Sequence, residues 1–206
     1  MLRISNVQTY GWEAAIRGMR NPMNSWKNMD SDFENMVLGE NDYNLAKTLA
    51  NLGPVHGKFL RMITVTMDII APLYWWKEFD TYKVGTVANS CSTMHKIQAK
   101  EFTLDDFSHE HLDKTSLKVL DAVRGQLNFY RKRFLKTKDK DYWWQMIQLL
   151  PSSFNQKRTI QMNYEVLRNI YYNRRNHKLD EWHTLCQAIE GLPYSSLIIK
   201  EEKNDD

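Results

Sequence analysis

The chain has 206 residues, of which 42% are hydrophobic and 26% charged, and these proportions are typical of a globular protein with a substantial core. The formal charge of +3 is too small for the basic surface of most nucleic-acid-binding proteins, so we expect no nucleic-acid partner. Two cysteines do not make a disulfide framework, and no long apolar run marks a signal peptide or a membrane span. These features predict a cytoplasmic protein with no membrane partner.

The N-terminal segment shows a strand pattern followed by a helix pattern. Leu2, Ile4 and Val7 alternate weakly with polar residues and indicate a strand. Residues 12–19 then have apolar side chains at helical spacing. The polar stretch 27–40 predicts a long loop, and loops of this length are often functional or mobile.

A second helix is expected around Leu49. Asn41 or Asp42 is a suitable cap, and Gly53 followed by Pro54 is a typical helix stop.

A clear strand pattern and a short helix follow. Apolar and polar residues alternate from Ile63 to Ile69, which predicts a half-buried strand. Pro72 can open a helix, because proline is well tolerated in the first turn. Because Trp75 and Trp76 are adjacent, we expect one ring to point inward and the other elsewhere.

Helices dominate the second half of the chain. Thr103 and Asp106 resemble a capping box. The charged tail 200–206 is expected to be disordered. The sequence predicts a single helix-rich α/β (α+β) domain over 1–199, packed around a small mixed or antiparallel sheet. Its later helices are expected at 112–136, at 142–150, at 159–173 and in a last segment capped by Asp180.

Two stretches of the chain resemble the flavin-dependent thymidylate synthase family. That family has a Leu-Pro pair, followed at fixed spacing by Asn, Leu, Asn or His, and Arg. The central loop 86–95 adds an Asn and a Ser that match the family, Asn89 and Ser92. The C-terminal residues that match are Leu150, Pro151, Asn163, Leu167, Asn169 and Arg174.

The chain departs from the family where phosphate-binding cations are expected. The family's Arg-His-Arg corresponds here to residues 80–82 or, in an alternative register, to residues 82–84. Ile147 stands where the family often has an arginine, and isoleucine has no hydrogen-bond donor to offer a phosphate. Lys83 is a possible substitute cation.

The resemblance implies the fold and the reaction of that family. In that reaction methylenetetrahydrofolate provides a methylene group to dUMP, reduced FAD provides the hydride, and NADPH re-reduces the flavin. The resemblance also implies a homotetramer and a pyrimidine nucleotide partner such as dUMP.

The same resemblance gives the candidate site residues their roles. Arg174 would polarise the pyrimidine, and Ser92 would contact the nucleotide, so both are candidate catalytic residues. Arg174 could equally offset the dipole of its helix, and the asparagines could be ordinary exposed helix residues. The candidate cofactor-binding residues are Asn163, Asn169, Asn89 and Lys83.

Three functions therefore remain open. The first is a divergent flavin-dependent thymidylate synthase, and the second is a related flavoenzyme acting on another pyrimidine nucleotide. The third is a non-catalytic nucleotide-binding or assembly protein that retains the fold. We expect no metal site, because no His or Cys spacing is typical of zinc, and we expect Cys91 to be a buried structural thiol.

Overall fold

The computed structural model of this protein describes residues 1–199. The expected disorder of residues 200–206 lies outside this described part. Across residues 1–199, no helix has both the length and the apolar character needed to cross a bilayer.

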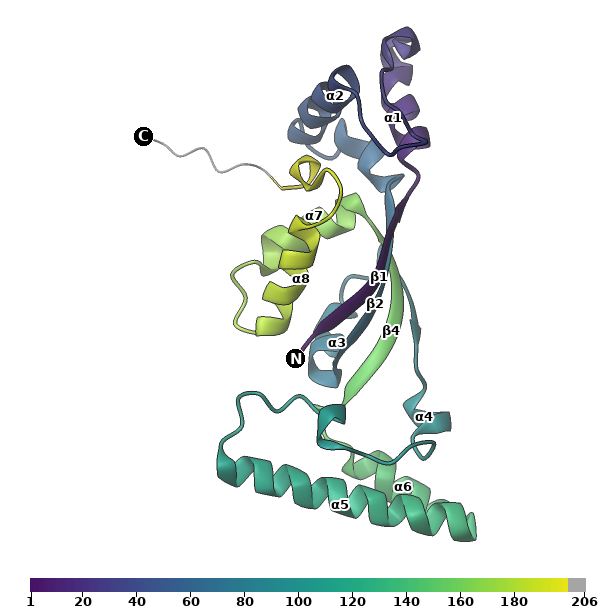
Figure 1. Cartoon of the computed structure of the whole chain (residues 1–206), viewed down its shortest axis with the longest axis vertical. Helices are drawn as coiled ribbons and strands as arrows, with labels where there is room; N and C mark the ends of the chain where they lie inside the picture. The colour runs from purple at the N-terminus through teal and green to yellow at the C-terminus, as the bar shows by residue number, and fades with distance from the viewer. Residues whose placement is uncertain (200–206) are drawn as a thin grey trace. The chain divides into compact units, whose positions relative to one another are not determined.

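Helices and strands alternate along the described chain (Figure 1). The strands and α-helices are β1 (Arg3–Tyr10), α1 (Trp12–Arg20), α2 (Glu40–Asn51), β2 (Thr64–Pro72), α3 (Leu73–Phe79), β3 (Val87–Ser90), α4 (Thr93–Lys96), α5 (Lys114–Thr137), α6 (Lys140–Leu149), β4 (Asn155–Asn163), α7 (Tyr164–Arg174) and α8 (Asp180–Glu190). The short 3₁₀ helices are η1 (Asn21–Met23), η2 (Trp26–Asn28), η3 (Gly57–Arg61), η4 (Leu104–Asp106) and η5 (Ser195–Leu197).

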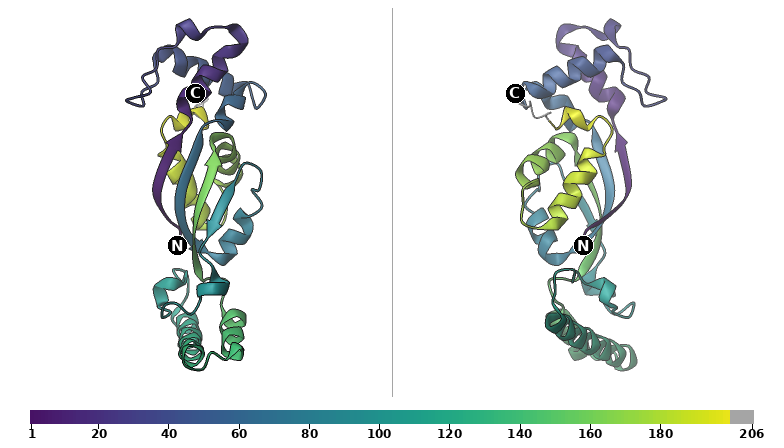
Figure 2. Two further views of the ribbon diagram at one scale, coloured as in Figure 1. Left: turned by 90° about the vertical axis from the view of Figure 1, so that its right-hand side faces the viewer. Right: turned by 60° about the vertical axis from the view of Figure 1, so that its left-hand side comes forward.

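The strands form one antiparallel four-stranded sheet in the order β1-β2-β4-β3. Figure 2 shows them side by side in this order, with β1 purple, β2 blue, β4 green and β3 teal. Val65, Met67 and Ile69 of β2 are buried while their polar neighbours are partly exposed, so the predicted strand alternation is confirmed. The predicted fold class, helix-rich α/β around a small sheet, is confirmed as well.

The described residues form two compact units, and β2 and β4 each contribute residues to both. The predicted single domain over 1–199 stays a prediction. Unit 1 comprises residues 1–3, 69–81 and 89–159. Unit 2 comprises residues 4–68, 82–88 and, within the described chain, 160–199.

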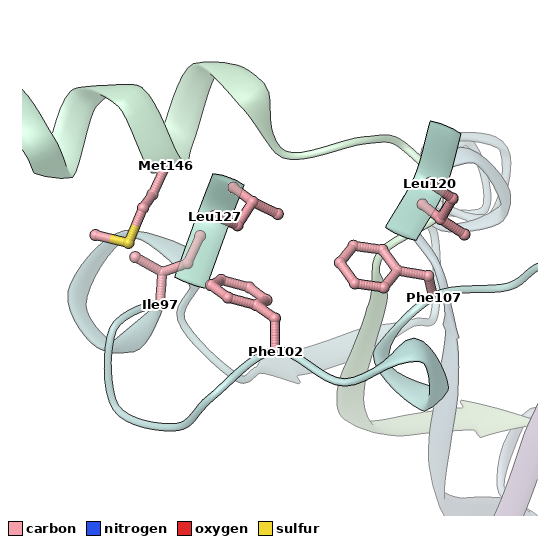
Figure 3. Packing of buried hydrophobic residues seen from close by; sticks show 6 residues of the cluster. All are labelled: Ile97, Phe102, Phe107, Leu120, Leu127 and Met146. Atoms are coloured by element: carbon pink, nitrogen blue, oxygen red, sulfur yellow. The ribbon is translucent and has the colours of Figure 1, made fainter. Parts of the chain in front are cut away.

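The core of unit 1 lies between the α5–α6 helical hairpin and the segment that precedes it. Figure 3 shows the six buried residues that form this cluster. Asn128 of α5 fixes the segment by exchanging two hydrogen bonds with the backbone of Phe102, each of 2.9 Å. The predicted capping box of Thr103 and Asp106 is present at η4. The cluster residues are Ile97, Phe102, Phe107, Leu120, Leu127 and Met146.

The adjacent tryptophans of α3 correct one expectation. Trp75 and Trp76 are both buried, with exposures of 0% and 1%, whereas only one ring was expected to point inward. The two indole rings contact each other edge-on, and each also packs against Phe79. Two consecutive side chains of this short helix are therefore buried together. Trp143 and Trp144 of α6 are also adjacent but differ in burial, because Trp143 is half-buried and Trp144 is exposed.

The beginning of α2 in unit 2 corrects a second expectation. Gly39 occupies the cap position instead of Asn41 or Asp42. The carboxylate of Asp30, from the preceding loop, accepts hydrogen bonds from the backbone of Asn41 at 2.9 Å and of Asp42 at 3.0 Å. The Asp42 side chain is thereby available for a buried ion pair with Arg20, at 2.6 Å.

The region 159–173 corrects a third expectation, because it is not one helix. Residues 155–163 form β4, and α7 begins only at Tyr164. Ile160 and Met162 are buried and alternate with exposed Thr159 and Gln161, which is a strand period that overlaps the following helical pattern. The spacing of Met162 with later residues suits a helix. Pairing with β2 nevertheless makes this segment a strand.

The remaining predicted helices are present with small shifts of their ends. The predicted helix at 112–136 begins at Lys114, where Asp113 accepts a hydrogen bond from the backbone of Ser116. The last helix begins at Asp180, with Leu179 rather than Asp180 at its cap position.

Candidate functional site

The candidate residues from the sequence divide between the two units. Lys83, Asn163, Asn169 and Arg174 belong to unit 2. Ser92 and Asn89 belong to unit 1.

Asn163 is the helix cap of α7 and the last residue of β4. Its side-chain oxygen accepts a hydrogen bond from the backbone N–H of Val166 at 3.0 Å. This bond satisfies one of the unpaired donors at the helix start and typically stabilises a helix by about 1 kcal/mol. Asn163 therefore lies at the junction of β4 and α7, whereas Asn169 lies within α7, and the expected single helix that carries both is absent.

The segment that carries Lys83 lies against the start of α7. Gly85 has a φ of +74°, and a β-carbon at this position would lie 3.0 Å from Nδ2 of Asn163 and 3.1 Å from Cγ2 of Val166. Glycine is required for both reasons, the backbone conformation and the close approach. Lys83 itself is exposed.

Asn169 lies on the exposed face of α7, beside a cavity of about 400 Å³. Its Oδ1 accepts a hydrogen bond from Nδ2 of Asn173 at 2.6 Å. The cavity is lined by Val84, Glu165, Val166, Arg168, Asn169 and Tyr172.

Arg174 is half-buried at the end of α7 and interacts with two aromatic rings. Its Nε donates a hydrogen bond to the hydroxyl of Tyr82 at 2.8 Å. The guanidinium carbon lies 4.8 Å from the ring centre of Trp182 and 5.5 Å from that of Tyr82. These contacts give Arg174 a structural role in joining α7, α8 and the Tyr82 segment.

Ser92 in unit 1 combines a capping role with a place on a cavity wall. Its hydroxyl accepts a hydrogen bond from the backbone of His95 at 3.0 Å and caps the short helix α4. Ser92 also lines a cavity of about 500 Å³. Asn89 lies exposed on strand β3, and it does not line this cavity.

The cavity beside Ser92 has apolar walls and a positively charged surround. Phe102 and Phe154 form aromatic walls, and their ring centres lie 6.2 Å apart. Arg3, Lys96 and Lys157 also line it. A flat anionic molecule matches this combination, because rings pack on apolar walls while cations bind an anionic group.

The carboxylates of this cavity only partly offset its positive charge. Asp106 forms an ion pair and hydrogen bond with Lys100. Burial on its own would raise the pKa of Asp106, but hydrogen bonds from Lys100 and Thr103 outweigh burial and hold the pKa below its usual value. Asp106 is therefore ionised at neutral pH and neutralises Lys100.

The segment aligned with the family's Arg-His-Arg has different partners in this chain. Asp80 accepts a hydrogen bond from Nη1 of Arg158 at 2.6 Å, and the Arg158 guanidinium lies 4.2 Å from the ring centre of Trp76. The hydroxyl of Tyr82 is bound to Arg174. Ile147 packs against the apolar cluster of unit 1.

The thiol of Cys91 is exposed and lines the cavity beside Ser92, whereas the sequence led us to expect a buried structural thiol. Cys91 directly follows β3, and because β3 lies at the edge of the sheet, the thiol is open to solvent. Cys186 is the buried thiol, and burial raises its pKa to about 11. Among the described residues, no group of three or more His, Cys, Asp or Glu side chains could hold a metal ion.

Two features of unit 2 have no counterpart in the sequence predictions. Glu165 lines the cavity at Asn169, and the sequence signal that marks it is an acid in the first turn after a capping asparagine. A larger cavity of about 850 Å³ lies between α1, α2 and η3, and Met19, Leu49, Phe59 and Met62 contribute to its walls. Long-range packing forms this cavity, so local sequence patterns do not reveal it.

No protein-family model and no curated protein sequence matches this chain. Solved structures do match. A crystal structure of Thymidylate Synthase X (ThyX) from Helicobacter pylori with FAD and dUMP matches with a TM-score of 0.70 and 17% sequence identity, over 96% of each chain. A second structure of the flavin-dependent thymidylate synthase ThyX from the same organism, complexed with FAD and dUMP, matches with a TM-score of 0.68 and 17% identity. It covers 94% of this chain and 96% of the other. This protein therefore has the fold of a flavin-dependent thymidylate synthase.

Proposed function

We propose that this protein is a divergent relative of the flavin-dependent thymidylate synthases that binds a pyrimidine nucleotide such as dUMP in the cavity beside Ser92. The observation that carries the proposal is the chemistry of this cavity on a fold shared with dUMP-bound ThyX. Cations line the cavity together with two phenylalanine rings, and Ser92 lies where the resemblance implies a nucleotide contact.

Each part of a pyrimidine nucleotide has a suitable group on this cavity. Lys96, Lys157 and Arg3 can bind the phosphate, since ammonium and guanidinium groups form charge-assisted hydrogen bonds with phosphate oxygens. Phe102 and Phe154 provide the aromatic surface for the pyrimidine ring. Asn155 and Gln156 also line the cavity, but their amides bond within the protein, Asn155 with Ser108 and Gln156 with Arg158.

The residues present do not fit the diphosphate of FAD at the positions that the resemblance implies. Asp80 stands where the family has a cation, and it accepts a hydrogen bond from Arg158. Tyr82 accepts a hydrogen bond from Arg174. Within residues 80–84, Lys83 is the remaining cation. A diphosphate needs several donors, and a carboxylate repels it. Residues 80–84 therefore do not provide a binding site for a flavin diphosphate.

A second candidate function is the family's complete reaction, the methylation of dUMP to dTMP with FAD, methylenetetrahydrofolate and NADPH. The fold match with a ThyX structure that contains FAD and dUMP favours it. The third candidate is nucleotide binding without catalysis, and the altered cation set at residues 80–84 favours it.

Calorimetric titration of the full chain with dUMP tests the proposal. We expect binding that weakens as salt rises, because cations on the cavity wall attract the phosphate. Lys96→Glu should weaken binding by at least roughly tenfold, since it reverses one phosphate contact. Lys118→Glu, on an exposed position of α5, makes the same charge change away from the cavity and should leave binding unchanged.

Two further measurements separate the candidate functions. Visible flavin absorbance in the purified protein would favour the flavoenzyme, and tritium release from dUMP labelled at carbon 5 would favour the synthase. If the wild-type chain does not bind dUMP in the titration, the proposed function is wrong.

A further inference from the structure

The α5–α6 hairpin of unit 1 ends in a surface that is rich in lysine. Residues 131–140 contain six basic side chains and one acidic side chain, Asp139. Arg131 and Arg133 donate hydrogen bonds to other groups of this unit. The other four cations are exposed and form no ion pair with any described residue, so their like charges repel one another and favour a partner of opposite charge. We call these four residues, Lys132, Lys136, Lys138 and Lys140, the basic tip.

Exposed aromatic rings accompany the lysines of the basic tip. Phe129 is 51% exposed and lies three residues before Lys132, so the two side chains share one face of α5. Trp144 is 41% exposed, and the Lys140 ammonium lies 5.9 Å from its ring centre. Exposed rings within a charged rim are typical of a protein–protein interface, because aromatic side chains are enriched at interfaces and the rim is polar.

The loop that leads into α2 in unit 2 carries the opposite charge. Residues 28–46 contain five acidic side chains and no lysine or arginine. Asp42 is neutralised by Arg20, and Asp30 accepts the backbone hydrogen bonds at the start of α2. The other three carboxylates are exposed and form no ion pair with any described residue. We call residues 32–40, with the carboxylates of Asp32, Glu34 and Glu40, the acidic loop.

Hydrogen bonds within the acidic loop hold its charges in place. Asp32 and Val37 exchange two backbone hydrogen bonds of 2.8 Å. The Asp32 carboxylate accepts hydrogen bonds from the Asn35 side chain at 2.7 Å and from the backbones of Glu34 and Asn35 at 3.1 Å. These bonds, that of the Asn35 side chain foremost, hold the pKa of Asp32 below its usual value, so its carboxylate is ionised at neutral pH. Met36 and Val37 are 47% and 53% exposed, so the loop presents apolar surface beside its negative charges.

We propose that the basic tip of one copy of this chain binds the acidic loop of a second copy. Each surface combines exposed apolar side chains with one sign of charge, and the two signs are opposite. Complementary charge sets the orientation and the choice of partner, while burial of Phe129 and Trp144 against Met36 and Val37 supplies affinity. The contact joins two different surfaces and is therefore heterologous.

A second copy accounts for both surfaces, whereas a nucleic acid or an anionic membrane would account for the basic tip alone. The apolar faces of α5 and α6 pack into the core of unit 1, which also disfavours insertion of this hairpin into a bilayer. The contact does not depend on the proposed function, because no residue of the basic tip or of the acidic loop lines the cavity beside Ser92.

Charge reversal on the two surfaces tests the proposal. The tip variant carries Lys132→Glu and Lys136→Glu, and the loop variant carries Glu34→Lys and Glu40→Lys. Sedimentation velocity over a concentration series of the full chain, without nucleotide, measures self-association. We expect each variant to self-associate at least roughly tenfold more weakly than the wild type, because like charges then meet, while circular dichroism confirms the fold. Self-association of the wild type should also weaken as salt rises.

A mixture of the two variants provides the discriminating arm. The reversed tip of one variant meets the reversed loop of the other, and the intact tip meets the intact loop. The mixture should therefore associate with an affinity within about threefold of the wild type, although neither variant does so alone. A control variant with Lys114→Glu and Lys118→Glu makes the same charge change at the other end of α5 and should self-associate like the wild type.

Three results contradict the proposal. They are a wild-type chain that is monomeric at every concentration, self-association that is unchanged in either variant, and a mixture of the variants that stays dissociated. If the monomeric wild type instead binds heparin, a soluble polyanion, and the tip variant does not, the basic tip belongs to an anionic partner and the proposal is wrong.

Discussion

The buried ion pair of Arg20 and Asp42 joins the end of α1 to the start of α2. Arg20 Nε donates to Asp42 at 2.6 Å, and the two side chains are 4% and 0% exposed. Asp42 also accepts from the backbone N–H groups of Asp30 and Ser31 and from the Ser31 hydroxyl. A buried pair of this kind is costly to break, because removing one partner leaves an uncompensated charge.

The stability of this pair should depend on pH. Burial on its own would raise the pKa of Asp42, but hydrogen bonds from Ser31 and Arg20 outweigh it and hold the pKa below its usual value of 3.8. A lowered folded-state pKa stabilises the fold at pH values above about 4, and this contribution is lost as pH falls through the folded pKa. Asp42→Asn should reduce the free energy of unfolding by about 3–5 kcal/mol at pH 7, with a smaller reduction at pH 3.

Urea denaturation of both proteins across this pH range measures the effect. Asp121→Asn serves as the control, because Asp121 forms an exposed pair with Arg124 at 2.8 Å, and such pairs contribute less than about 1 kcal/mol. A difference between wild type and Asp42→Asn that does not shrink on acidification would contradict the assignment of the pair.

Arg174 should affect stability as well as any ligand binding. Arg174→Ala removes the contacts with Tyr82 and Trp182 and should lower the free energy of unfolding by about 1–3 kcal/mol. The resemblance predicts that this variant also loses nucleotide binding, whereas the proposed cavity beside Ser92, which Arg174 does not line, predicts that dUMP binding is retained. Thermal denaturation gives the first effect and titration with dUMP the second.

Arg17→Ala is the comparison for Arg174→Ala. Arg17 is exposed and pairs with Glu13 one turn earlier, at 2.9 Å, so its removal should cost about 0.5 kcal/mol or less. If Arg174→Ala is as stable as Arg17→Ala, its aromatic contacts do not hold α7 and α8 together.

At the scale of elements, two glycines show why the same substitution has opposite effects. Gly85→Ala places a β-carbon at φ +74° and within 3.0 Å of the Asn163 side chain, so it should destabilise the fold by about 1–3 kcal/mol. Gly125→Ala lies inside α5 with nothing within 4 Å of the new carbon, so it should stabilise the fold by about 0.5–1 kcal/mol. Chemical denaturation of the two variants measures both signs, and a stabilised Gly85→Ala would show that the segment does not pack against α7.

At the scale of the whole molecule, the fold match extends over 96% of this chain, while the identity is only 17%. Fold can persist at this identity because buried apolar positions tolerate many substitutions of similar size. The chemistry depends on individual donors and acceptors, which a single substitution removes. The altered cation set at residues 80–84 is therefore compatible with the shared fold, and its effect on ligand binding stays a prediction.

The homotetramer implied by the resemblance is a prediction for the whole molecule. Exposed large apolar side chains in the described chain, Val119, Phe129 and Trp144 among them, are consistent with an interface. Light scattering coupled to size-exclusion chromatography should give about four times the chain mass of 24.5 kDa. A monomeric mass would contradict the prediction.

Residue patterns in the sequence determined much of the fold. The alternation through β2, the amphipathic spacing of α5 and the Asn89, Ser92 and Arg174 matches are local features, and each pointed to the observed fold. Local patterns succeed here because burial against one surface imposes a period of two on strands and of about 3.6 on helices.

Only the tertiary structure decided whether a segment whose pattern suits both a strand and a helix forms one or the other. It also decided which side chains contact each other. Residues 159–163 became a strand because β2 and β3 flank them in the sheet, although their spacing also suited a helix. The hydrogen bond from Arg174 to Tyr82 arises from contact between segments that are 92 residues apart in the chain. Such contacts depend on the packing of whole elements, and no local period in the sequence encodes them.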